Sequence, residues 1–350
     1  MTTGQLEFTV HREFSDFDAN EWNALLARSV TDTPFLRYEY QRNWWEHRGG
    51  GEWPEAELTL VAARGAEGLA GVAPLFRAVH DGRPALLLVG SIEISDYLDL
   101  IVPAASLAEF TAGLFAHLEG GGLGSRSALD WYNIPDASPT LRQLRDEADR
   151  RQWSYVEETY RPTPYIALPA DFQRYLEGLD KKQRHEIRRK MRRLDERGGA
   201  TRWYIVKGDN IDSEFEALFG MMAQDSGKAS FLTPEMRAQM RGAMQAAHEA
   251  GWLWLAFLEI DGMKAAASLN FDYGGRLWGY NSAVNREFLD ASPGWVLLGH
   301  VLQWAIENGR TEFDFMRGGE AYKYRFGAVD RYVVRAQVSP AQRLPSEIHT

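Results

Sequence analysis

The chain of 350 residues contains no cysteine. This absence excludes disulfides, a thiolate nucleophile and any cysteine-ligated metal. The sequence also has no G-x-S-x-G nucleophile motif and no G-x-x-x-x-G-K-[ST] phosphate loop. Its eight histidines are scattered without metal-ligand spacing. We therefore predict no metal site.

Long apolar runs are missing as well. Residues 1–14 hold no apolar segment of signal-peptide length, and no later run is long enough to span a bilayer. We therefore expect a cytoplasmic protein without a transmembrane segment. The formal net charge of −10 argues against general coating of nucleic acid, but it leaves room for one local basic surface.

What is present is enough apolar sequence for two domains, because 45% of the residues are hydrophobic. Each half reads as a strand, two helices, three or four strands, a helix and a strand. This order predicts two tandem α/β domains with mixed sheets flanked by helices. We place them at 1–160 and 165–338, with Arg161-Pro162-Thr163-Pro164 as the linker and 339–350 as a flexible tail.

The stretch Asp290 to Gly327 contains a complete helix and strand. Ser292 suits an N-cap and Pro293 the first helical position, and 311–316 alternates as a strand. With the preceding strand, 277–283, this makes a strand–helix–strand unit whose strands pair in parallel. The helix then begins at the carboxyl end of a strand. The N–H groups of Gly294 and Trp295, in the first turn, are free of helix partners, and they predict an anion site.

Lys181 to Arg197 is the most biased segment of the chain and predicts a helix capped by Asp180. Its apolar stripe consists of Ile187, Met191 and Leu194. Its exposed row of arginines consists of Arg184, Arg188 and Arg192. One interpretation is a surface for a polyanion: RNA, a nucleotide-linked sugar or an acidic membrane. The other is a solvated helix between the domains.

Three segments, Leu179 to Gly199, Ser292 to Gly309 and Phe313 to Gly327, resemble GNAT-fold acyltransferases of the Fem-like two-domain class. The likeness extends to bacterial GNAT-type acyltransferases linked to exopolysaccharide or cellulose biosynthesis. It implies two tandem GNAT-like domains, an acyltransferase activity, and acyl-CoA (acetyl-CoA) as co-substrate. Two features depart from the class. The helical arm is shortened to one helix, and Asn285 to Gly294 stands in place of the Gln/Arg-x-x-Gly-x-Gly/Ala pyrophosphate motif.

The resemblance also assigns residues. Tyr322-Lys323, two residues and Phe326-Gly327 resemble the aromatic–Lys–x–x–Phe–Gly ending of the Fem enzymes, which implies that Lys323 lies at the acyl-donor site. For donor binding we add Ser292, Gly294, Trp295 and Tyr322. If 322–326 is a strand, Lys323 and Arg325 share one face. The alternative is a plain amphipathic edge strand.

Acyl transfer to an amine requires no covalent enzyme intermediate, which suits a chain without cysteine. Asp314 is the candidate general base and Tyr324 the candidate proton donor. The alternative for Asp314 is a salt bridge to Arg317 or exposure at a sheet edge. For the acceptor we select Glu320 together with Asp96 and Asp99, which frame the start of a predicted strand at 97–102. The alternatives are a plain loop residue for Glu320, and a capping and a surface aspartate for Asp96 and Asp99.

Three functions remain open. The first is transfer of an acyl group from acyl-CoA to an amine of a small molecule, amino sugar or cell-envelope precursor. The second is Fem-type aminoacyl transfer from aminoacyl-tRNA. The third is a non-catalytic GNAT-like scaffold in a polysaccharide-synthesis assembly. The sequence determines neither the acceptor nor the oligomeric state.

Overall fold

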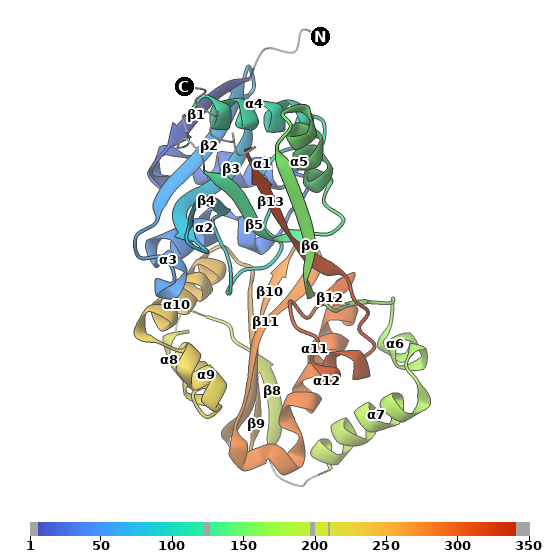
Figure 1. Ribbon diagram of the computed structural model, residues 1–350. Helices are drawn as coiled ribbons and strands as arrows, with labels where there is room; N and C mark the ends of the chain where they lie inside the picture. The colour runs from blue at the N-terminus through green and yellow to red at the C-terminus, as the bar shows by residue number, and fades with distance from the viewer. Residues whose placement is uncertain (1–5, 122, 124–126, 197–199, 209–210, 341–350) are drawn as a thin grey trace, which may run out of the picture. The chain divides into compact units, whose positions relative to one another are not determined.

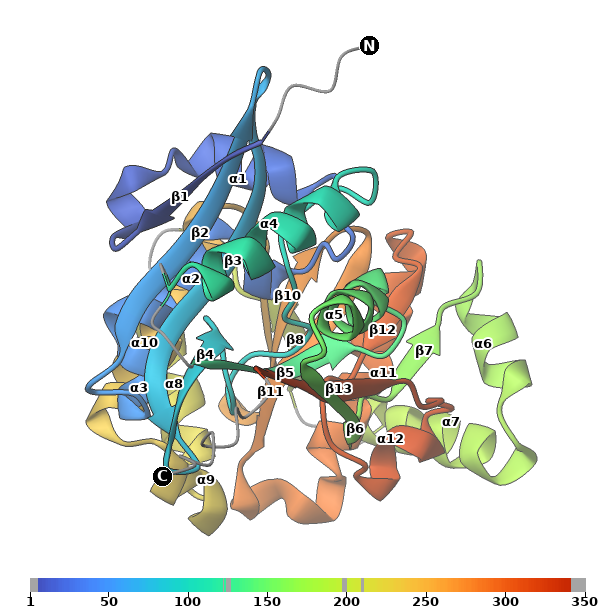
Figure 2. The same cartoon turned by 45° about the horizontal axis from the view of Figure 1, so that its top comes forward.

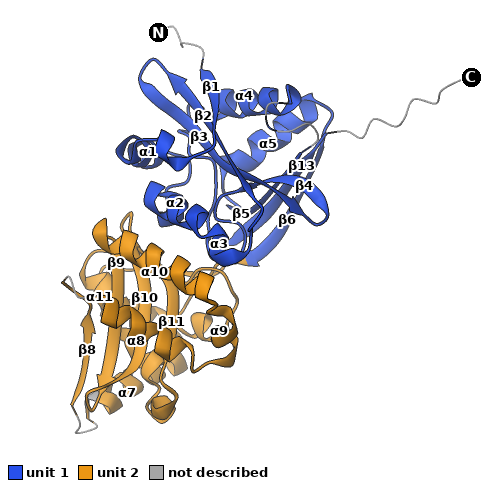
Figure 3. Cartoon of the chain, turned by 90° about the vertical axis from the view of Figure 1, so that its left-hand side faces the viewer, with its two compact units in different colours: residues 1–161, 332–350 blue, residues 162–331 orange. Residues whose placement is uncertain are grey.

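The computed structural model describes residues 6–121, 123, 127–196, 200–208 and 211–340. The chain forms two compact units. The first comprises residues 1–161 and 332–350, and the second comprises residues 162–331 (Figure 3). None of the helices in the described residues is both long and apolar enough to cross a membrane.

The first unit is built on a seven-stranded sheet in the order β1-β2-β3-β4-β5-β13-β6. The strands are β1 (Glu7–His11), β2 (Glu57–Gly65), β3 (Gly68–His80), β4 (Arg83–Leu88), β5 (Ala128–Pro135), β6 (Ser154–Pro162) and β13 (Tyr332–Ser339). The β4–β5 pair is parallel, whereas β1 to β4 pair antiparallel along the chain. The predicted strand at 97–102 is absent. Tyr97 has a left-handed φ of 55°, and only an isolated bridge joins Ile101 to Val72.

In the described part of this unit, seven helical segments flank the sheet. They are η1 (Phe14–Asp16), α1 (Ala19–Leu26), η2 (Pro34–Leu36), α2 (Tyr38–Glu46), α3 (Arg48–Gly51), α4 (Leu107–Glu119) and α5 (Pro139–Arg150). Asp18 caps α1 by accepting from the N–H groups of Asn20 and Glu21, both at 2.9 Å. α4 and α5 pack against each other (Figure 2).

The last strand corrects the predicted domain limits. We assigned residues 332–338 to the C-terminal domain, but β13 lies in the first sheet between β5 and β6. It pairs antiparallel with β5, from Val333 opposite Pro135 to Val338 opposite Leu129. Its valines are buried, so hydrophobic burial with β5 holds the strand there. Of the predicted tail, residues 341–350 lie outside the described residues.

The second unit contains a six-stranded sheet in the order β7-β12-β11-β10-β9-β8. The strands are β7 (Tyr165–Ala167), β8 (Thr201–Ile205), β9 (Leu253–Ile260), β10 (Met263–Tyr273), β11 (Arg276–Val284) and β12 (Glu312–Asp314). Asp261 and Gly262 join β9 to β10 with φ of 53° and 79°, as a two-residue hairpin requires. Only β11 and β12 pair in parallel among the strand pairs of this sheet that the structure describes.

The helices of the second unit cover both faces of its sheet (Figure 1). They are α6 (Phe172–Gly178), α7 (Lys181–Asp195), α8 (Asp212–Met222), α9 (Ser226–Phe231), α10 (Pro234–Glu249), η3 (Arg286–Ala291), α11 (Pro293–Glu307) and α12 (Ala321–Arg325). α7 is the basic helix. Its apolar stripe packs in the core beside α11, so it belongs to this unit. The mixed α/β architecture that the sequence predicts is therefore confirmed.

Candidate active site

β11 and β12 separate soon after they pair. Their parallel register covers only Arg276 to Trp278 against Glu312 to Asp314. β11 continues to Val284, while the chain beyond β12 turns toward β7, where the Phe315 N–H donates to the Pro164 carbonyl oxygen at 2.9 Å. A gap between two parallel strands therefore opens at their carboxyl ends, where ligands of α/β sheets bind.

A cavity of about 400 Å³ occupies this separation. Its walls come from α9, β10, β11, β12 and the segment after it, the first turns of α11, and α12. Aromatic and apolar side chains dominate on the α11 side: Trp295, Leu297, Leu298, Phe313, Phe315 and Phe326. Polar side chains line the β10 and β11 side: Ser268, Asn270, Asn281 and Ser282. This combination is typical of a site for a small molecule.

The start of α11 forms one end of the cavity. Of the residues selected for donor binding, Gly294 and Trp295 line it, whereas Ser292 is not among the lining residues. Ser292 adopts a left-handed conformation with φ of 53° and makes no side-chain cap, contrary to its predicted N-cap hydrogen bond. The Trp295 N–H donates to the Ser292 carbonyl oxygen at 3.1 Å. One of the two N–H groups of the predicted anion site is therefore already hydrogen-bonded within the chain. A Cβ at Gly294 would lie 2.8 Å from Val284 Cγ2, so glycine is required for this close approach.

Lys323 lies in the cavity wall but its ammonium points at the backbone. The residues Tyr322 to Phe326 do not form a strand, because α12 spans Ala321–Arg325. Lys323 is 2% exposed, and its Nζ donates to the carbonyl oxygens of Met316, Arg317 and Gly318 at 3.3, 3.0 and 2.8 Å. It also pairs with Glu320 at 2.8 Å. Lys323 thus holds the segment that follows β12.

The neighbouring candidates fall into two groups. Tyr322 and Glu320 line the cavity. Partial burial raises the pKa of Tyr322 to about 12, and the Glu320 carboxylate adds to this shift. Tyr324 is not among the lining residues, and its hydroxyl donates to Asp330 at 2.8 Å. The structure therefore separates Tyr324 from the candidates around the cavity.

Asp314 is fully buried and lies outside the cavity lining. The predicted alternation is confirmed, because Phe313 and Phe315 line the cavity whereas Asp314 faces away from it. Its carboxylate accepts from the Met316 N–H at 2.7 Å and forms an ion pair with Arg331. Of the predicted alternatives, exposure at a sheet edge is wrong, because Asp314 is buried.

Asp96 and Asp99 are buried in the first unit, at 4% and 0% exposure. Asp99 accepts from the Ser138 hydroxyl at 2.5 Å, the Thr31 hydroxyl at 2.6 Å and the Leu100 N–H at 2.7 Å. Burial raises the pKa of Asp99, while these hydrogen bonds act in the opposite direction. Asp99 therefore joins parts of its own unit, and neither aspartate presents a surface to an acceptor.

The first unit also has a parallel pair that separates, between β4 and β5, but its own chain occupies that end of β5. The Asn133 side chain donates to the carbonyl oxygens of Ile92 and Ser95, both at 2.9 Å. The Asn133 carbonyl accepts from the Leu98 N–H at 2.9 Å. The cavity between separated parallel strands lies in the second unit, so that unit carries the candidate active site.

Sequence reasoning missed Lys228. It lies on α9 and lines the cavity, and its Nζ donates to Asn281 Oδ1 at 3.0 Å and to the Ser282 carbonyl oxygen. Burial lowers the pKa of Lys228, and the carboxylates of Asp225 and Glu320 oppose this shift. No motif marks this residue, because its neighbours in the cavity come from a strand more than 50 residues later.

The basic helix α7 lies beside the same end of the cavity. The Lys190 ammonium is 4.1 Å from the ring centroid of Trp295 and 3.0 Å from a Glu186 carboxylate oxygen. Met191 lies against Gly299, where an added Cβ would come 2.9 Å from its sulfur. Lys190 therefore links α7 to the first turn of α11, and Arg188, Arg189, Arg192 and Arg193 are exposed along the helix.

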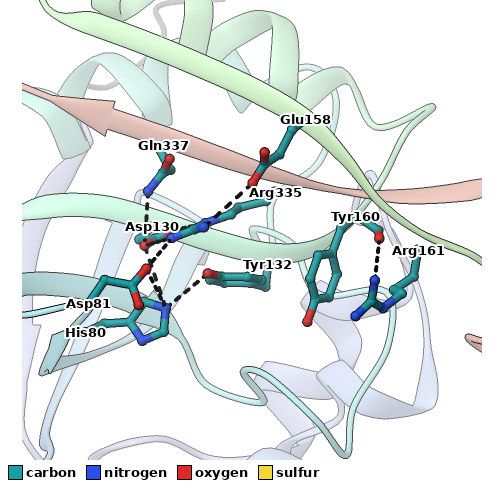
Figure 4. Close-up of polar contacts among 9 residues, drawn as sticks. All are labelled: His80, Asp81, Asp130, Tyr132, Glu158, Tyr160, Arg161, Arg335 and Gln337. Atoms are coloured by element: carbon teal, nitrogen blue, oxygen red, sulfur yellow. Dashed lines mark hydrogen bonds and ion pairs between the residues drawn. The ribbon is translucent and has the colours of Figure 1, made fainter.

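A second polar cluster lies in the first unit (Figure 4). His80, Asp81 and Asp130 offer three ligand atoms within 4.8 Å of one another, a grouping that histidine spacing along the chain did not indicate. Arg335 already pairs with Asp130 at 2.7 Å and with Asp81 at 3.1 Å, and His80 contacts the Tyr132 hydroxyl at 3.0 Å. A cation would have to compete with the Arg335 guanidinium for both carboxylates.

Comparison with known proteins identifies the fold. Residues 181–324 match the family model described as the acetyltransferase (GNAT) domain. The FemX crystal structure aligns with a TM-score of 0.63 and 14% identity, over 94% of this chain and 96% of that chain. L-PGS from Bacillus licheniformis aligns with a TM-score of 0.55 and 11% identity, over 93% of each chain.

A tandem GNAT protein from the clavulanic acid biosynthesis pathway aligns with a TM-score of 0.50 and 13% identity, over 97% of this chain and 100% of that chain. No curated protein sequence matched the chain. The prediction of a Fem-like fold with two tandem GNAT-like domains is confirmed.

Proposed function

We propose that this chain, with its Fem-like two-domain GNAT fold, transfers an acyl group from acyl-CoA to an amine of a small molecule, amino sugar or cell-envelope precursor. The observation that carries the proposal is the cavity between the separated strands β11 and β12, which ends at the first turn of α11. A helix start favours phosphate, and the apolar wall suits a pantetheine chain. Acyl-CoA is held inside the cell, so the proposal places the reaction in the cytoplasm.

The reaction that fits this cavity is direct attack. A neutral amine attacks the thioester carbonyl, a C–N bond forms, and the C–S bond breaks to release the thiol after proton transfer from the amine. Beyond Trp278, β11 no longer pairs with β12. Backbone N–H groups along that edge of β11 are suited to stabilise the developing oxyanion. The protein then acts mainly by aligning two substrates.

Aminoacyl-tRNA is the second candidate donor. The basic helix α7 favours it, because Lys190 lies over Trp295 at the end of the cavity and exposed arginines continue along the helix. An extended polyanion would use this row, whereas CoA needs only the cavity end. A scaffold that docks through α7 without catalysis is the third candidate.

Thermal denaturation with each donor separates these candidates. A ligand at a hundred times its dissociation constant stabilises the protein by about 2.7 kcal/mol. We expect acetyl-CoA to raise Tm and deacylated tRNA to leave it unchanged. Stabilisation by tRNA alone would replace the proposed donor. No response to either donor would favour the scaffold.

A further inference from the structure

The cavity is lined from both faces of the second sheet. Trp254 of β9 packs against Trp304 of α11, with ring centroids 4.9 Å apart. Phe257, three residues later, lies on the opposite face, where Lys264 covers its ring at 4.7 Å and pairs with Glu214 of α8 at 2.6 Å. α9 follows α8 on that face, away from α11 (Figure 1). A donor held at α11 therefore leaves the α9 side for the acceptor.

Lys228 is the cation on the α9 side. Its two hydrogen-bond acceptors, Asn281 Oδ1 and the Ser282 carbonyl, are both neutral. Within the described residues, no carboxylate lies within ion-pair distance of its ammonium. A partly buried ammonium without a paired anion loses hydration free energy that no ion pair offsets, so it favours binding of an anion.

The other charges of the cavity wall do not supply that anion. Glu320 is the acidic residue among the described lining residues, and its carboxylate pairs with Lys323 at 2.8 Å. The lining thus carries more positive than negative charge, which favours a ligand with a negative group.

We propose that Lys228 binds a negatively charged group of the acceptor, so that the preferred acceptor is an amine that also carries a carboxylate or phosphate. This inference rests on the proposed acyl transfer. The ammonium keeps its two neutral contacts and gains a charge-assisted hydrogen bond to the anion. The same contact orients the amine, because it fixes a second point of the acceptor relative to the donor carbonyl.

Calorimetric titration of the CoA-saturated protein tests this inference. Matched probes differ only in the negative group: alanine against alaninamide, and glucosamine 6-phosphate against glucosamine. We expect the wild type to bind at least one anionic member about tenfold more tightly than its neutral partner. The carboxylate and phosphate pairs show which group is recognised.

Substitutions assign the preference to Lys228. Lys228→Gln keeps a hydrogen-bonding side chain without charge and should remove the preference, whereas Lys228→Arg should retain part of it. Lys207→Met is the matched control, because Lys207 is exposed and does not line the cavity. Equal affinities within both pairs, no binding of any probe, or an unchanged preference in Lys228→Gln would each overturn the inference.

Titration with CoA alone keeps the two proposals distinguishable. The wild type and Lys228→Gln should bind CoA equally, because Lys228 lies on the acceptor side. A tenfold loss of CoA affinity in Lys228→Gln would place Lys228 on the donor side and overturn the inference. A wild type that does not bind CoA would reject the proposed donor, and the probes are then titrated onto the unliganded protein to decide on Lys228 separately.

Discussion

The Lys323 ammonium donates a hydrogen bond to the carbonyl oxygen of Gly318 at 2.8 Å. Two further carbonyl groups, of Met316 and Arg317, accept from the same nitrogen. Met316 and Arg317 line the cavity. By binding the carbonyl oxygens of this segment, Lys323 fixes its backbone conformation and so the shape of this wall.

Replacing Lys323 should therefore destabilise the second unit. Lys323→Met leaves buried carbonyl groups without their charged donor, and we expect a loss of about 3 kcal/mol in the free energy of unfolding. Urea denaturation measures this loss. Arg325→Ala, at an exposed position of the same helix, is the control and should change stability little. Unchanged stability in Lys323→Met with abolished transfer would instead assign Lys323 to the chemistry.

Gly294 tests the donor end of the cavity. Gly294→Ala places a Cβ 2.8 Å from Val284 Cγ2, so it narrows the cavity end without adding charge. Gly294→Asp adds the same Cβ and a negative charge where we propose phosphate. We expect CoA affinity to fall modestly in the alanine variant and to be lost in the aspartate variant. Equal affinities of the two variants for CoA would exclude a phosphate at this helix start.

Asp314→Asn separates a structural from a catalytic role. The change removes the charge that pairs with Arg331, and we expect about 2 kcal/mol of destabilisation with Glu312 still bound to Arg331. Because Asp314 does not line the cavity, the pH profile of kcat/KM should keep its shape. Loss of the acidic limb of that profile, at unchanged stability, would restore Asp314 as general base.

Asp99 gives a pH dependence of stability. Its pKa is raised in the folded state by burial, so folding favours the protonated carboxyl. This contribution is complete below the ordinary value of 3.8 and is lost as pH rises through the raised pKa. Asp99→Asn does not titrate, so the wild type should lose stability relative to this variant across that window. Urea denaturation from acidic to neutral pH measures the difference, and parallel curves would contradict the assignment.

Local sequence predicted much of the second unit correctly. Asp261-Gly262 marked the β9–β10 hairpin, and Pro293 marked the first residue of α11, because turn and helix-start preferences depend on neighbouring residues. The alternation of Phe313, Asp314 and Phe315 was also correct. The stretch from Tyr322 to Phe326 was not, because its alternating side chains suited a strand equally and its tertiary contacts selected a short helix.

The sequence by itself determined the α/β class, the parallel strand–helix–strand unit and the basic helix, since each depends on periodicity and composition within a few residues. Only the tertiary structure decided that β13 completes the first sheet, that Lys323 faces backbone carbonyls and that Lys228 enters the cavity. The physical reason is the same in all three cases. In each case the partner is fixed by packing between elements that are distant in the chain. A pattern of neighbouring residues in the sequence does not show which distant elements pack together.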